Sequence, residues 1–155
     1  MSTTPPEHNL LLDPISELRL ALASHAFGVD ARTELLEAES FPRSAAERAE
    51  VQAEADLSGH TPDRVVARAR VVFLAGEGEA VVSLSAGGYR VDRWTLDTPL
   101  PTTAYESLDA LLIASSPAYV AAMQAELHKR FASDDVSRRF VYDDDDDGEE
   151  PAWID

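Results

Sequence analysis

The sequence predicts an α+β fold: N-terminal helices, then a three-stranded antiparallel meander, then two C-terminal helices and a disordered acidic tail. Apolar residues recur at helical spacing before residue 58 and after residue 103, and alternate with polar ones between residues 64 and 96. The 155 residues are enough for one domain. We therefore expect a flexible arm over residues 1–12, a single domain over 13–142 and a disordered tail over 143–155.

The first predicted helix begins at Asp13-Pro14, a capping carboxylate followed by proline at the first helical position. Its apolar stripe includes Ile15, Leu18 and Leu22, and Gly28 ends it. A short second helix is expected after Asp30, with leucines 35 and 36 facing inward.

A third helix is predicted from Ser44 to about residue 57. Ser44 and Glu47 have the spacing of a capping box, and Ser58-Gly59 closes the helix. The apolar side is expected to face inward and the acidic side outward. The inner residues are Ala46, Ala49, Ala53 and Leu57, and the outer ones are Glu47, Glu50 and Glu54.

The meander is predicted from three apolar runs and two glycine turns. The run 64–74 places Val65, Ala67, Ala69, Val71 and Phe73 on one face, and Arg68 and Arg70 on the other. The second strand contains Ala80, Val82 and Leu84, and the third runs from Tyr89 to Leu96. Glycines at 76 and 78 and at 87 and 88 supply the hairpin turns.

Two helices are expected after the meander. Thr103 and Glu106 have capping-box spacing, and Ser116-Pro117 separates the two helices. In the second helix we expect a core stripe, a break at 133–135 and an edge strand over 136–142. The stripe consists of Val120, Met123, Leu127 and Phe131.

The amino-acid composition limits the classes of partner and site that the protein can have. The formal net charge is −16, and ten acidic against two basic residues between Asp134 and Asp155 supply half of it. Such a charge repels phosphate backbones, so direct nucleic-acid binding is not expected and a basic protein partner is favoured. Solubility, or a source that lives in high salt, would also explain the acidity. Absence of cysteine excludes disulfides and thiolate sites.

No apolar run exceeds six residues, so we expect no membrane segment, and the first fourteen residues lack the basic residues and the long apolar stretch of a Sec-type signal peptide. These features predict a cytoplasmic protein. A homodimer is compatible with the sequence.

The C-terminal segment is the main candidate binding site. An acidic run, Asp143, Asp144, Asp145, Asp146 and Asp147, precedes Pro151, Trp153 and Ile154. Trp153 would supply buried contact area, while the charges would speed the encounter with a basic groove. The segment resembles the C-terminal tails of bacterial single-stranded-DNA-binding proteins, which recruit partners through an acidic stretch and a terminal Pro-Phe. The resemblance covers about thirteen residues and departs at the tip.

The same run matches the first half of a calcium-binding EF-hand loop. The twelfth position, which requires a carboxylate, is Ile154. We therefore predict no metal site. No cofactor is expected either, since the glycines at 76 and 78 lack the rest of a nucleotide fingerprint and no histidine has a ligand partner four residues on.

A second surface is suggested by Arg68 and Arg70, which form a solvated sheet face or a surface that the acidic tail covers. Glu47, Glu50 and Glu54 form an acidic helix face that could imitate DNA phosphates. The order of elements is similar to that of double-stranded-RNA-binding domains, but the helix start at 103–106 lacks their basic cluster. The order and the acidity also loosely resemble the small chaperones of type III secretion systems, but the two further strands that those folds carry after the meander are not evident in this sequence.

The prediction is a non-catalytic protein-binding module, either an adaptor, an inhibitor or a chaperone-like protein, with a C-terminal docking tail. The alternatives are a DNA mimic that inhibits a DNA-binding protein, and a small enzyme whose chemistry no motif reveals.

Overall fold

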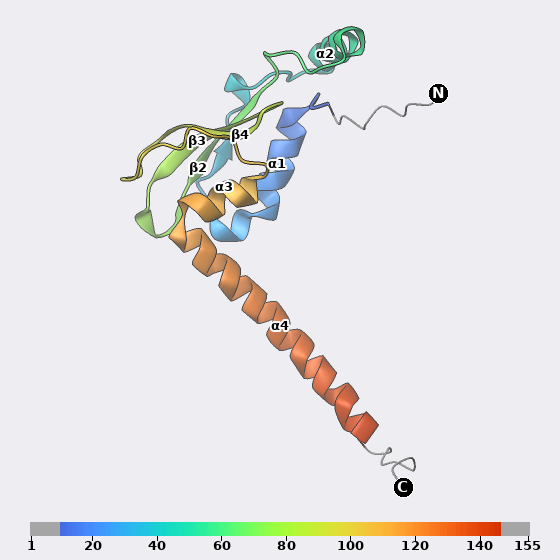
Figure 1. Cartoon of the computed structure of the whole chain (residues 1–155), viewed down its shortest axis with the longest axis vertical. Helices are drawn as coiled ribbons and strands as arrows, with labels where there is room; N and C mark the ends of the chain where they lie inside the picture. The colour runs from blue at the N-terminus through green and yellow to red at the C-terminus, as the bar shows by residue number, and fades with distance from the viewer. Residues whose placement is uncertain (1–9, 147–155) are drawn as a thin grey trace. The chain divides into compact units, whose positions relative to one another are not determined.

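The computed structural model describes the backbone of residues 10–146 and the side chains of residues 10–132. The chain divides into two units, Met1–Val120 and Ala121–Asp155. Four α-helices, three short 3-10 helices and four strands make up the described part (Figure 1). In chain order they are α1 (Pro14–Ser24), η1 (Ala26–Gly28), β1 (Glu34–Leu35), η2 (Glu37–Glu39), α2 (Ala45–Ser58), β2 (Ala67–Val72), η3 (Leu74–Gly76), β3 (Glu79–Ser85), β4 (Gly88–Trp94), α3 (Leu108–Ser115) and α4 (Pro117–Asp146).

The predicted antiparallel meander is confirmed, and one strand is added to it. The sheet order is β1-β2-β3-β4, with every neighbouring pair antiparallel. Ala69 of β2 lies opposite Val82 of β3, which in turn lies opposite Val91 of β4. A register shift between Val81 and Val82 marks a bulge in the β3–β4 ladder.

The core lies on the sheet face that the alternation predicts. The residues at 65, 67, 69, 71 and 73 are all 1% exposed or less. Helix α1 packs against β1, β2 and β3, and α3 packs against β4 (Figure 1). Leu18, Leu111 and Leu112 supply fully buried side chains from these helices. The structure thus has helices over one sheet face and arginines on the other.

Helix α1 begins as predicted. Asp13 is the N-cap, its carboxylate accepts a hydrogen bond from the backbone N–H of Ser16, and Pro14 occupies the first turn. The helix ends at Ser24, and η1 completes the segment to Gly28. The predicted helix is therefore confirmed, with its last turn tightened.

The short helix predicted after Asp30 is wrong. Residues 34 and 35 instead form β1, which pairs with Arg70 and Ala69 of β2, and only η2 is helical. The backbone N–H groups of Asp30, Leu36 and Phe41 donate to carbonyls along β2 and just before it. A neighbouring strand that offers hydrogen bonds along the whole segment outweighs a weak local helix preference.

Helix α2 has the predicted capping box and the predicted glycine terminus, since Gly59 adopts a φ of 81°. Its predicted inner face is wrong. Val51 and Ala55 are buried, whereas Leu57 is 90% exposed. At 3.6 residues per turn, Val51 and Ala55 lie on nearly the opposite side of the helix from Ala49 and Ala53. The buried side of α2 is the one that carries its single valine.

The capping box predicted at Thr103–Glu106 is also wrong. Ser107 caps α3, its side chain accepting a hydrogen bond from the N–H of Ala110. Tyr105 instead exchanges two backbone hydrogen bonds with Tyr89 of β4. A segment that pairs with a strand edge cannot also form the first helical turn. The boundary at Ser116-Pro117 is confirmed.

Helix α4 is longer than predicted. It continues through Ser133–Asp135 to Asp146, so the predicted break and the edge strand over 136–142 are wrong. Serine and aspartate inside a helix each cost only a few tenths of a kcal/mol, too little to end it. The predicted core stripe is wrong as well, because Leu127 is 45% and Phe131 66% exposed. Within residues 10–146, every helix is too short or too polar to cross a lipid bilayer.

Candidate functional site

The residues predicted to bind a partner fall in three places. Asp143, Asp144, Asp145 and Asp146 form the last turn of α4, in a segment that the sequence predicted to be disordered. Asp147, Pro151, Trp153 and Ile154 lie outside the described residues, as does the N-terminal arm up to residue 9. Arg68 and Arg70 lie on the open sheet face.

The two arginines of β2 are neutralised within the domain. Arg68 Nε lies 3.1 Å from Asp92 Oδ2, and its guanidinium also donates to the carbonyl of Glu39. Arg70 lies 2.9 Å from Glu34 on the neighbouring strand and 3.7 Å from Glu79. Ser83 donates to the other oxygen of Asp92. These contacts form a cross-strand charge network, so the arginines already have acidic partners.

The three glutamates of α2 that were predicted to form an acidic face make contacts within the protein. Glu47 accepts hydrogen bonds from the backbone N–H groups of Arg43 and Ser44, which lowers the pKa of its carboxyl. Glu54 is hydrogen-bonded to Arg64, and this lowers the pKa of Glu54. Glu50 lies 4.0 Å from the same guanidinium, which stacks over the ring of Phe41 at 5.2 Å. The structure therefore uses these side chains for local contacts.

A partly buried polar cluster that the sequence did not predict surrounds Tyr119. Its hydroxyl donates to Asp109 Oδ1 at 2.6 Å and lies 3.1 Å from His25 Nδ1. Because the single hydroxyl proton points to Asp109, His25 Nδ1 is the donor in the second contact. The C-terminal end of α1 and the first turns of α3 and α4 meet at this tyrosine.

The ring of Tyr119 is fully buried, and its position depends on a glycine. A Cβ atom at Gly28 would overlap the ring carbons Cδ1 and Cε1 of Tyr119. Phe27 stacks on the same ring at a centroid distance of 5.7 Å. Burial, with a further contribution from Asp109, raises the pKa of Tyr119 far above that of free tyrosine. A hydroxyl kept neutral in this way serves as a fixed donor, and a proton-transfer role is disfavoured.

A second contact holds the first turn of α4. The Glu77 carboxylate, next to η3, accepts hydrogen bonds from the Ser116 hydroxyl at 2.5 Å and the Ala118 backbone N–H at 2.8 Å. The Ser116 hydroxyl in turn accepts from the N–H of Tyr119. A carboxylate at a helix N-terminus satisfies free donors and complements the helix dipole. We call Glu77, Ser116, Tyr119, Asp109 and His25 the α4 clamp.

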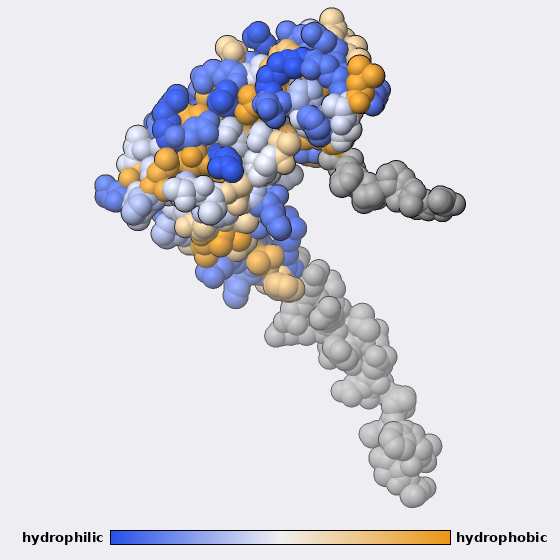
Figure 2. Space-filling model, turned by 45° about the horizontal axis from the view of Figure 1, so that its top comes forward, coloured by the Kyte–Doolittle hydropathy of each residue, from blue (hydrophilic) through white to orange (hydrophobic). Residues whose placement is uncertain are grey.

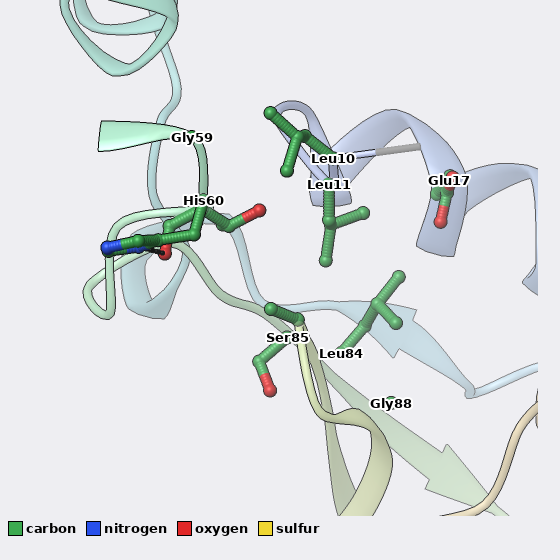
Figure 3. Close-up of a pocket in the computed structure, with 10 residues that line it drawn as sticks. Leu10, Leu11, Glu17, Gly59, His60, Leu84, Ser85 and Gly88 are labelled. Atoms are coloured by element: carbon green, nitrogen blue, oxygen red, sulfur yellow. Dashed lines mark hydrogen bonds between the residues drawn. The ribbon is translucent and has the colours of Figure 1, made fainter. Parts of the chain in front are cut away.

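The first unit also contains an open groove of about 580 Å³ (Figure 3). Leu10, Leu11 and Leu84 give it apolar walls, with Glu17 and His60 on different sides. His60 Nδ1 lies 3.3 Å from the carbonyl of Thr61. Burial, and to a smaller extent the Glu17 carboxylate, raises the pKa of nearby Tyr89. The groove combines one carboxylate with leucines, a lining that suits a ligand with an apolar body and a positive charge.

No group of three or more potential metal-ligating side chains occurs in the part of the chain whose side chains are described. The EF-hand-like run at residues 143–154 falls outside that part.

Comparison with known proteins gives no relative: no family model, curated protein or solved structure matches the chain. The fold and the side-chain contacts are therefore the basis for any functional proposal.

Proposed function

We propose that the protein is a non-catalytic protein-binding module, of adaptor, inhibitor or chaperone-like type, that docks on a basic partner through residues 143–155. The observation that carries the proposal is the continuity of α4, which runs from the α4 clamp to Asp146. The helix connects the clamped first turn to the acidic run without interruption.

The distribution of charge supports the same proposal. Arg68 and Arg70 on the sheet face are paired with local carboxylates, whereas the ten acidic residues from Asp134 to Asp155 exceed the basic ones in that segment by eight. A cluster of like charge accelerates association with an oppositely charged surface. Trp153 is the residue type that most often dominates interface energy, and solubility alone does not require it.

The polar contacts of the α4 clamp support a structural use of the titratable groups that form it. His25, Asp109 and Tyr119 bond to one another, and Glu77 caps a helix. Each is explained by the architecture without reference to a reaction.

The test is affinity capture from cells of the source organism, with the full chain as bait. Trp153→Ala and the replacement of Asp143–Asp147 by asparagine serve as variants. A partner that binds the full chain and is lost with Trp153→Ala is expected.

Surface plasmon resonance on that partner then separates the two contributions. Trp153→Ala should cost about 2 kcal/mol and act through faster dissociation. The asparagine variant should slow association and reduce its dependence on salt. If Trp153→Ala binds like the parent, the proposed docking mechanism is wrong, and a bound metabolite in place of a protein would favour an enzyme.

A further inference from the structure

Helix α4 carries an exposed apolar stripe. Val120, Met123, Leu127 and Phe131 are spaced by three, four and four residues, which places them on one side of the helix. Leu127 and Phe131 are 45% and 66% exposed, and the other two are half-buried. By contrast, Leu18 of α1 and Leu111 of α3 are completely buried. Figure 2 shows apolar residues interspersed with hydrophilic ones on the face it presents.

The charge around this stripe differs from that of the whole chain. Residues 117–132 contain one acidic residue, Glu126, and two basic residues, Lys129 and Arg130. The segment is therefore slightly positive in a chain whose net charge is −16. Two copies of this segment therefore repel one another only weakly, whereas segments as acidic as the rest of the chain would repel one another strongly.

The stripe is complementary to itself in one orientation. If two α4 helices lie antiparallel and cross between residues 125 and 126, Val120 is level with Phe131 of the other copy, and Met123 lies within one residue, about 1.5 Å of rise, of the level of its Leu127. Each pair then combines one of the larger side chains with a smaller or more flexible one, a combination that favours interdigitated packing. The same register keeps all four apolar residues of each helix in the contact.

The acidic end of the helix selects against the parallel arrangement. Two parallel helices in register would place the two copies of the last helical turn, Asp143–Asp146, side by side, and like charges at this distance repel. In the antiparallel register the two copies of this turn are about 60 Å apart, at 1.5 Å of rise per residue.

We propose that α4 binds α4 of a second copy of this chain, antiparallel, through Val120, Met123, Leu127 and Phe131. The interface contains four apolar side chains from each copy, so a dissociation constant on the order of micromolar is expected. The dimer would carry two acidic C-terminal segments, and if these dock as proposed above, its binding to a clustered partner would be bivalent. Only that last consequence rests on the proposed function.

The oligomeric state of the full chain provides the test. Sedimentation equilibrium between about 1 and 200 μM should show a monomer–dimer equilibrium for the parent, given a micromolar constant. The double variant Leu127→Gln and Phe131→Gln should remain monomeric, with at least a tenfold weaker association. Glutamine preserves helix propensity, so loss of the helix is not expected. A far-UV circular dichroism spectrum checks this.

The matched control is Leu57→Gln on α2, because Leu57 is 90% exposed and lies outside the stripe. This variant should dimerise like the parent. A parent chain that is monomeric throughout the range would overturn the proposal. So would a dimer that the double variant retains, or one that only Leu57→Gln abolishes.

The absence of cysteine allows the orientation to be tested separately. An equimolar mixture of Val120→Cys and Phe131→Cys chains should form a mixed disulfide under mild oxidation, because these positions face each other. Phe131→Cys alone should not, since the two copies of residue 131 are about 16 Å apart along the axis. A rapid disulfide between two Phe131→Cys chains would show parallel pairing and contradict the proposed geometry.

Discussion

The helices that cover the sheet and the part of α4 beyond Val120 contain similar apolar residues, but these residues have different environments. Leu18, Leu108 and Leu111 are at most 2% exposed, whereas Leu127 and Phe131 are about half exposed or more. In the sequence, the apolar residues of both regions recur at the same helical spacing. The comparison teaches that periodicity identifies an apolar side of a helix, while burial requires a surface for that side to cover.

The boundary between the two regions coincides with the α4 clamp. Tyr119 is the last residue of the buried core among the residues whose side chains are described. His25, Asp109 and Glu77 attach the first turn of α4 to three other parts of the first unit. Changes at the clamp and changes beyond it should therefore have very different effects on stability.

The largest effect is expected at Tyr119. Tyr119→Ala removes a fully buried ring and leaves a cavity between η1 and α3, so it should reduce the free energy of unfolding by about 3–5 kcal/mol. Chemical denaturation followed by circular dichroism measures this. Tyr119→Phe keeps the ring and loses only the hydrogen bonds, so its cost should be about 1 kcal/mol. Equal stability of the alanine variant and the parent would show that the ring is not part of the core.

Alkaline pH should act on the same residue. The pKa of Tyr119 is raised in the folded state, whereas an unfolded tyrosine ionises near 10. Above that value the unfolded chain releases a proton that the folded chain retains, so stability should fall as pH rises. The maximum slope from one group is about 1.4 kcal/mol per pH unit. The parent should lose more stability than Tyr119→Phe between pH 9 and 11, although Tyr89 adds to the slope in both. Parallel pH profiles would contradict the assignment.

A smaller effect is expected at Glu77. Glu77→Ala removes the acceptor for the Ser116 hydroxyl and the Ala118 N–H, and should cost about 1–2 kcal/mol. Thermal unfolding provides the measurement. Glu106→Ala is the control, because Glu106 is an exposed carboxylate in the loop before α3. If both variants melt together, the carboxylate of Glu77 does not stabilise the start of α4.

Local sequence signals predicted those features of the fold that depend on local contacts. The Asp13 cap, the Ser44–Glu47 capping box and the alternation from Val65 to Phe73 each involve residues within a few positions of one another. The prediction was wrong where a distant segment intervened. Leu35 pairs with β2, and Tyr105 pairs with Tyr89, and neither contact leaves a pattern in the residues beside it.

The candidate site also has features that the local sequence predicted and features that depend on distant contacts. Arg68 and Arg70 were correctly placed on the polar sheet face, but their pairing with Asp92 and Glu34 depends on strand register. The meeting of His25, Asp109 and Tyr119 joins positions up to 94 residues apart, so no spacing rule could have identified it. Gly28 was interpreted only as a helix terminus, and its second use, leaving room for the Tyr119 ring, required the structure.

The smallest effect is expected beyond the clamp, and it separates the two regions most directly. Deleting residues 143–155 removes none of the residues that are buried among those described, since these end at Tyr119. The melting temperature at a concentration of a few micromolar or less should therefore change by no more than about 1–2 °C, which corresponds to about 0.5 kcal/mol for a chain of this size. Differential scanning calorimetry on the parent and the deletion measures this. A substantial loss of stability would mean that the C-terminal segment packs on the first unit, and hydrogen exchange on β2, near Arg68 and Arg70, would then also become faster in the deletion. Unchanged exchange together with an unchanged melting temperature would leave the segment available to a partner, as the proposed function requires.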